Sequence, residues 1–221
     1  MNRMLTGILE LDGVAVAGGR VLLISGDMTR LLESTTTDDS GVFRFALTDV
    51  TSVVVLAKIQ GQVLSIAYRI IDLAIHGPGP YRIGIDSSTE LFHSVKARIV
   101  ADEGRPPYLL VHLDPVRLIG IPEPLEKFFR TIDENVVAAS FSQVRVEGDG
   151  FEIRVQNGSY RVDAGYFDKS HLADIANYAL AEVTPDGEET TVFEDPFASF
   201  MLDVERDRDV ELTIRPLASE K

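Results

Sequence analysis

The sequence predicts an all-β protein made of two tandem antiparallel β-sandwich domains, the second carrying short helical insertions. Short apolar or alternating segments are separated by turn residues about every 8–12 positions, a spacing typical of sandwiches. The first 86 residues lack helical periodicity. They carry 7 basic and 9 acidic side chains, whereas residues 87–221 carry 14 and 26. This unevenness indicates two domains, which we expect over residues 1–88 and 89–221.

The first domain is expected to contain about seven strands. Their alternation is clearest in residues 42–48, where Phe43, Phe45 and Leu47 share one face of the strand and the residues between them share the other. We therefore expect Phe43 and Phe45 to be buried. The predicted strands are 5–11, 20–25, 31–37, 42–48, 52–59, 63–72 and 81–86.

The stretch TTTDDSGVFRF, residues 35–45, combines two strand ends with a tight turn. The side chains of Asp38 and Asp39 suit local hydrogen bonds to the backbone, and Gly41 accepts a positive φ without steric cost. We therefore predict a β-hairpin at this position.

The same stretch, with LTGILEL (5–11) and DGVAVAGGRVLLI (12–24) before it, resembles the carboxypeptidase regulatory-like, or transthyretin-like, family of Ig-like β-sandwiches. The resemblance is best in residues 5–86, with a weaker second copy in 91–217. It implies fold-setting roles for Thr37, Asp38, Gly41, Phe43 and Phe45. It implies almost nothing about function. The hydrolases of this fold end in Tyr-Arg-Gly-Ser, whereas this chain ends in PLASEK, so their activity is not expected here.

The second domain repeats the strand pattern over 94–101 and 108–115. Asn157-Gly158 favours a type I′ turn, which predicts a hairpin with Phe151 and Ile153 buried on one arm. Alternating acids in residues 203–211 are interpreted as the solvated face of a strand. Helical spacing near residues 122–136 and 169–181 predicts the two insertions.

The insertion near 122–136 holds our candidate binding site. Neighbouring residues on a helix lie about 100° apart, so two arrangements of Phe128 and Phe129 are open. Either a wide apolar stripe buries both rings against the sheet, or one ring stays on the surface as an anchor, which is the arrangement that a binding site requires. Acidic groups beside that ring would favour a basic partner. The expected site residues are Phe128, Phe129, Glu123, Glu126 and Asp133.

We expect no cofactor, metal site or catalytic residues. The chain has no cysteine, which excludes thiolate zinc sites and a cysteine nucleophile. Its four histidines do not pair at ligand spacing, and no P-loop, dinucleotide-binding or nucleophile-elbow motif is present.

Net charge is −14 with a pI near 4.6, which disfavours nucleic acids and anionic membranes as partners. No signal peptide or membrane-spanning stretch is recognised, so a cytoplasmic location is expected. The favoured function is a non-catalytic module that binds or assembles with another protein. Two alternatives stay open, namely an enzyme with an unrecognised site in the second domain and a carbohydrate-binding or extracellular stalk module.

Overall fold

The computed structural model describes residues 3–59, 61, 63–77, 79–99, 108–130, 144–146, 150–167, 178–193, 197–205 and 208–216. Strands dominate this part of the chain, and the helices α1 (Leu73–His76) and α2 (Glu123–Glu126) are single turns. The predicted all-β class is confirmed. The chain divides into two compact units, one comprising Met1–Leu91 with Arg117–Val137 and the other Phe92–Val116 with Ala138–Lys221.

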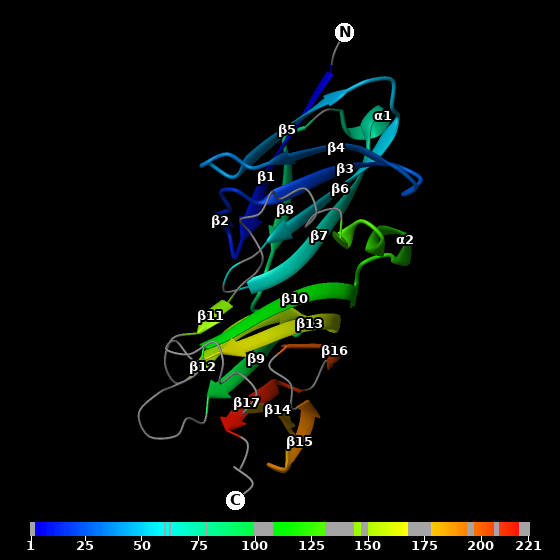
Figure 1. Cartoon of the computed structure of the whole chain (residues 1–221). Helices are drawn as coiled ribbons and strands as arrows, with labels where there is room; N and C mark the ends of the chain where they lie inside the picture. The colour runs from blue at the N-terminus through cyan, green and yellow to red at the C-terminus, as the bar shows by residue number, and fades with distance from the viewer. Residues whose placement is uncertain are drawn as a thin grey trace, which may run out of the picture. The chain divides into compact units, whose positions relative to one another are not determined.

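The first unit is a sandwich of two sheets (Figure 1). In the first sheet, β1 pairs with each of the other strands. In the second sheet, the strands follow the order β4-β3-β6-β7. The first sheet contains β1 (Arg3–Leu11), β2 (Val14–Ala15), β5 (Val42–Leu47) and β8 (Tyr81–Ile85). The second contains β3 (Arg20–Ser25), β4 (Leu31–Thr36), β6 (Ser52–Ile59) and β7 (Val63–Asp72).

The core of the first unit is built around the two predicted phenylalanines. Phe43 and Phe45 are both buried, and their ring centroids lie 5.8 Å apart. Phe43 is directly opposite Gly7 of β1, and a Cβ added to Gly7 would lie 2.2 Å from Cζ of the Phe43 ring. The glycine in the first strand therefore makes room for the aromatic ring across from it.

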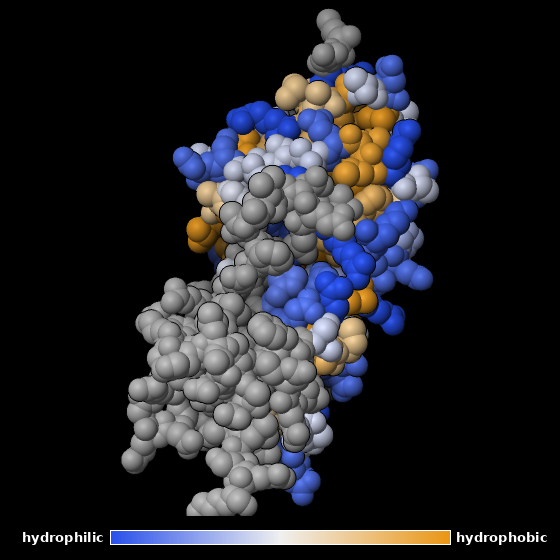
Figure 2. Space-filling view, viewed as in Figure 1, coloured by the Kyte–Doolittle hydropathy of each residue, from blue (hydrophilic) through white to orange (hydrophobic). Residues whose placement is uncertain are grey.

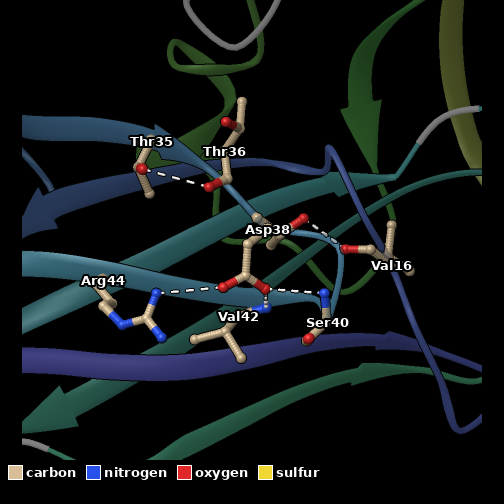
Figure 3. Close-up of polar contacts among 8 residues, drawn as sticks. Val16, Thr35, Thr36, Asp38, Ser40, Val42 and Arg44 are labelled. Atoms are coloured by element: carbon tan, nitrogen blue, oxygen red, sulfur yellow. Dashed lines mark hydrogen bonds and ion pairs between the residues drawn. The ribbon is translucent and has the colours of Figure 1, made fainter.

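The predicted hairpin at residues 35–45 is instead a corner between the two sheets. β4 pairs with β3 and β5 pairs with β1, so the flanking strands do not pair with each other. The Asp38 carboxylate accepts hydrogen bonds from the backbone N–H groups of Ser40 and Val42, each at 3.0 Å, and Arg44 Nη1 lies 3.3 Å from it (Figure 3). The turn chemistry is as predicted, but it redirects the chain to the opposite sheet.

Thr37 fixes the other end of this corner. Its buried hydroxyl accepts a hydrogen bond from the Gly19 N–H at 2.8 Å and donates one to the Val16 carbonyl. One side chain thus holds together two segments that are about twenty residues apart in sequence, which gives Thr37 the structural role that its place in the motif implies.

The second unit is also a sandwich. One of its sheets has the order β11-β10-β13-β16, with β10 (Tyr108–Leu118), β11 (Val144–Val146), β13 (Gly158–Phe167) and β16 (Phe197–Val204). The strands of its other sheet follow the order β15-β14-β17-β9-β12. They are β9 (Phe92–Ile99), β12 (Gly150–Gln156), β14 (Tyr178–Val183), β15 (Glu189–Phe193) and β17 (Val210–Pro216).

Among the described strands, each unit contains a parallel pair, a departure from the wholly antiparallel prediction. β1 pairs with β8 from Gly7↔Tyr81 to Leu11↔Ile85, and β9 pairs with β17 in the same sense. In both cases the pair joins the first strand of the unit to a late one. Alternation of apolar residues sets the faces of a strand but not its direction, so the sequence pattern did not contain this information.

The predicted hairpin at Asn157-Gly158 is a second corner. β12 pairs with β9, while β13 pairs with β16. Asn157 is fully buried, and the Tyr160 hydroxyl donates to the Gln156 carbonyl across the corner. Ile153 is buried as predicted, whereas the Phe151 side chain lies outside the described residues.

Two further boundaries differ from the prediction. The expected helix over 169–181 overlaps β14 from Tyr178 onward, and its earlier residues lie outside the described part. The acidic run 203–211 is not one strand, because β16 ends at Val204 and β17 begins at Val210.

Candidate functional site

The predicted site around Phe128 and Phe129 lies in the first unit, not in the second. Both rings are buried, with exposed fractions of 6% and 1%, so neither is available as a surface anchor and that prediction is wrong. The Lys127 ammonium lies 5.0 Å from the centroid of the Phe128 ring and donates to the Thr29 carbonyl at 3.2 Å. These contacts place the segment against the turn between β3 and β4.

A wide apolar stripe explains the burial of both rings. Leu125 is buried beside them, and the side chains of Leu22 and Leu56 lie opposite each other in β3 and β6 with no exposed surface. Of the predicted acids in this segment, Glu123 is exposed, Glu126 is half-buried and Asp133 lies outside the described residues. We infer that the segment forms part of the core of the first unit.

A different polar site is present on the second unit, on the outer face of the β10/β13/β16 sheet (Figure 1). Leu113, Tyr160, Val162 and Leu202 point inward and are buried. Because side chains alternate along a strand, the residues between them point outward. The outer residues are His112, Asp114 and Val116 on β10, Arg161 and Asp163 on β13, and Ser199, Met201 and Asp203 on β16.

Arg161 is the centre of this face. Its Nη2 lies 3.0 Å from Asp114 Oδ2, and its Nε lies 3.3 Å from Asp163 Oδ2. His112 Nδ1 approaches Asp163 Oδ2 to 3.6 Å. The Asp114 side chain is only 6% exposed, whereas Arg161 and Asp163 are partly open to solvent. Arg161 therefore links the buried carboxylate of Asp114 on β10 to the partly exposed carboxylate of Asp163 on its own strand, β13.

The surroundings of Asp163 keep it ionised. Partial burial acts to raise the pKa of this carboxyl. A hydrogen bond from the Ser199 hydroxyl and the charges of Arg161 and His112 outweigh that effect, so the pKa is lowered from its ordinary value. Asp163 is thus a stable anion at neutral pH.

Exposed apolar side chains flank this network. Val116 follows Asp114 on the same face of β10 and is 45% exposed. Met201 lies directly opposite Arg161 in the pairing of β16 with β13 and is 55% exposed. The first unit also exposes apolar side chains, including Ile75 of α1 at 73%, and Figure 2 shows apolar surface on that unit in the region of α1.

A second polar cluster joins β9, β12 and the turn before β17. The Asp209 carboxylate accepts a hydrogen bond from the Ser94 N–H at 3.1 Å and lies 3.7 Å from Lys96 Nζ. The Ser94 hydroxyl donates to Glu152 at 2.6 Å, and His93 Nδ1 lies 3.6 Å from Asp209. These bonds fix the turn to the sheet, which indicates a structural role.

The described residues show neither a metal-binding cluster nor a membrane-spanning helix. None of their His, Asp and Glu side chains gather in groups of three or more that could hold a metal ion. None of the described helices has the length and apolar character needed to cross a membrane.

The sequence contained a partial signal for the outer face. Polar residues alternate with apolar ones in 111–114 and again in 160–163, so each pair could be assigned to the exposed side of a strand. Residues on β10 and β13 are about fifty positions apart, however. Only the order of strands in the sheet shows that Asp114 and Arg161 meet.

Comparison with known proteins finds similar solved structures but no matching family. No protein-family model matches the sequence, and no curated protein matches it. The structure is similar to the shaft pilin SpaA from Lactobacillus rhamnosus GG, with a TM-score of 0.36, 9% identity and 99% of each chain covered. It is also similar to a streptococcal ancillary pilin, with a TM-score of 0.38 and 10% identity, over 100% of this chain and 63% of that one. The major pilin from Streptococcus pyogenes matches with a TM-score of 0.29 and 9% identity over 98% of each chain. Scores and identities of this size support no inference about function.

Proposed function

We propose that the chain is a non-catalytic module that assembles with another protein through the outer face of the β10/β13/β16 sheet. The observation that carries this proposal is the placement of two exposed apolar side chains, Val116 and Met201, beside an ordered network of ion pairs. Binding surfaces commonly combine apolar anchors with charged groups that set register and orientation.

The charge of the second unit favours a basic partner. Residues 92–116 and 138–221 together carry 11 basic and 21 acidic side chains. Among the described outer side chains of β10, β13 and β16, the carboxylates of Asp114, Asp163 and Asp203 outnumber the guanidinium of Arg161. A lysine or arginine of the partner, placed near Asp163 and Asp203, would complement this surface.

The protonation chemistry of the face favours binding over catalysis. A general acid or base works best with a pKa close to the operating pH, whereas the pKa of Asp163 is lowered. The Ser199 hydroxyl donates its hydrogen bond to the Asp163 carboxylate, which orients that carboxylate as an ion-pairing group.

Two further assignments belong to this proposal. The first unit is assigned to the carboxypeptidase regulatory-like family, because Thr37, Asp38 and Phe43 perform the fold-setting roles that the motif implies. The second assignment is a cytoplasmic location.

The function can be tested with a photo-crosslinking amino acid introduced at position 116 and, as a control, at position 75, which is also apolar and is more exposed. In the native host, position 116 should yield an adduct with a basic protein that mass spectrometry identifies. The same adduct should form with the purified partner and weaken as NaCl rises. Equal labelling from position 75, or an acidic partner insensitive to salt, would contradict the proposal.

A further inference from the structure

Strand β16 is an edge of its sheet. Among the described strands its one neighbour is β13, with which it pairs in unbroken register over eight positions, from Gly158↔Val204 to Gly165↔Phe197. The edge strand β15 differs, because its pairing with β14 shifts register between Leu180 and Ala181. A regular edge presents a row of backbone donors and acceptors that can pair with another strand.

The sequence of β16 lacks the usual protection of such an edge. Native sheets commonly blunt an edge with lysine, proline, a bulge or an inward-pointing charge. FASFMLDV contains no lysine, proline or glycine, and Asp203 is its only charged residue. Met201, at the middle of the described stretch, is more than half exposed.

We propose that β16 pairs antiparallel with β16 of a second copy of this chain, in a twofold-symmetric register centred on Met201. In this register Met201 faces Met201, Phe200 faces Leu202 and Ser199 faces Asp203. Residues that are opposite each other in this pairing lie on the same face of the sheet, so the exposed residues Ser199, Met201 and Asp203 meet exposed residues. The half-buried Phe200 meets the buried Leu202, and this pair continues the inner layer of the sandwich. The inference extends the proposed function, because self-pairing is one form of assembly.

Repulsion between the Asp203 carboxylates of the two copies favours this register over one centred on Asp203. The two Asp203 carboxylates lie four residues apart along the paired strands, about 14 Å at the rise of a β-strand. This separation exceeds the screening length of about 8 Å at physiological salt. A register centred on Asp203 itself would instead place the two carboxylates opposite each other, which is unfavourable.

Pairing of this kind has a consequence for the outer face. The twofold axis of an antiparallel edge pair runs perpendicular to the sheet, so the outer faces of both copies point in the same direction. Two Arg161 networks would then lie on one continuous surface. A partner with two basic segments would gain from binding both at once.

A cysteine cross-link tests the register directly, because the natural chain contains no cysteine. Met201→Cys should form a disulfide-linked dimer under mild oxidation, since opposed Cβ atoms in a strand pair lie about 5 Å apart. Ile75→Cys, at a more exposed position of the first unit, should stay monomeric. Absence of the Met201→Cys dimer, or equal dimer formation by Ile75→Cys, would overturn the proposed pairing.

Sedimentation equilibrium of the full chain tests the association itself. Each copy carries a net charge of −14, so dimerisation should strengthen at least severalfold as NaCl is raised from low to physiological concentration. Met201→Lys, which would set two cations face to face, should weaken self-association at least tenfold. Val116→Lys, on the same face but away from the edge, should leave it unchanged. A monomer at all salt and protein concentrations would overturn the inference.

These measurements use the chain alone, so they separate the inference from the proposed function. Partner binding is predicted to weaken with salt, whereas self-association is predicted to strengthen. If the unmodified chain stays monomeric but binds the basic partner with the predicted salt dependence, the inference is overturned and the proposed function stands.

Discussion

Arg161 reaches across from β13 to place its guanidinium 3.0 Å from the nearly buried carboxylate of Asp114 on β10. The same side chain lies beside Asp163 on its own strand. One cation thus stabilises two carboxylates in an environment where an uncompensated charge is costly. The face proposed for binding therefore depends on Arg161 for its order.

Replacing Arg161 by leucine should destabilise the protein by about 1–3 kcal/mol, because it removes the cation that compensates Asp114. The pKa of Asp163 should also rise, since one of the charges that lower it is lost. Chemical denaturation and NMR titration of the Asp163 carboxyl measure the two effects. Arg98→Leu, at an exposed position of β9, serves as the control and should change neither.

Asp27 provides a prediction about pH. Its carboxylate accepts hydrogen bonds from the Ser25 hydroxyl at 2.5 Å and from the Thr29 hydroxyl and N–H at 2.8 and 3.1 Å, and these lower its pKa to about 2. A lowered carboxyl pKa stabilises the folded state above the ordinary value near 3.8, and that contribution is lost as pH falls toward 2.

NMR titration of the Asp27 carboxyl should therefore give a midpoint near 2. Ser25→Ala removes the largest cause of the shift and should move the midpoint upward. A midpoint close to 3.8 in the unmodified protein would show that the turn between β3 and β4 does not hold these bonds in solution.

Gly7 and Gly84 form a matched pair of strand glycines. A Cβ on Gly7 would collide with the Phe43 ring, whereas a Cβ on Gly84 of β8 meets no atom within 4 Å. Gly7→Ala should destabilise the first unit by about 1–3 kcal/mol through overpacking. Gly84→Ala should be near neutral, and the smaller side chain of Phe43→Leu should relieve part of the cost of Gly7→Ala in the double variant.

Phe45 fills the centre of the same core, opposite Leu5. Phe45→Ala should cost about 3–5 kcal/mol of unfolding free energy, because it removes buried apolar area and leaves a cavity. Arg44→Ala, on the exposed face of the same strand, should cost far less. Similar midpoints of denaturation for the two variants would contradict the assignment of Phe45 to the core.

The sequence pattern predicted the positions of the strands better than it predicted which strands pair with each other. The alternation in β5 and the turn residues Asp38 and Gly41 identified two strands and a tight turn. A hairpin and a corner between sheets share that local signal, because the turn fixes the reversal of the chain but not the sheet that the next strand joins. The same ambiguity applies at Asn157-Gly158.

The candidate site shows more clearly what the sequence pattern could not predict. Helical spacing near Phe128 and Phe129 indicated an apolar segment, but not that it belongs to the first unit. Nothing local in the sequence shows why consecutive side chains of β3 and β6 are buried. Likewise, Asp114 and Arg161 meet only through strand order, a long-range property that a single sequence does not display.

The affinity of the purified partner for surface variants tests the proposed binding face most directly. Val116→Arg adds bulk and positive charge on that face, and Ile75→Arg makes the same change in the first unit. Isothermal titration calorimetry should show at least a tenfold loss of affinity for Val116→Arg, about 1.4 kcal/mol, with unchanged affinity for Ile75→Arg. Both variants should keep the melting temperature of the unmodified protein. Unchanged affinity for Val116→Arg, or an equal loss for Ile75→Arg, would contradict the assignment of the β10/β13/β16 face as the binding surface.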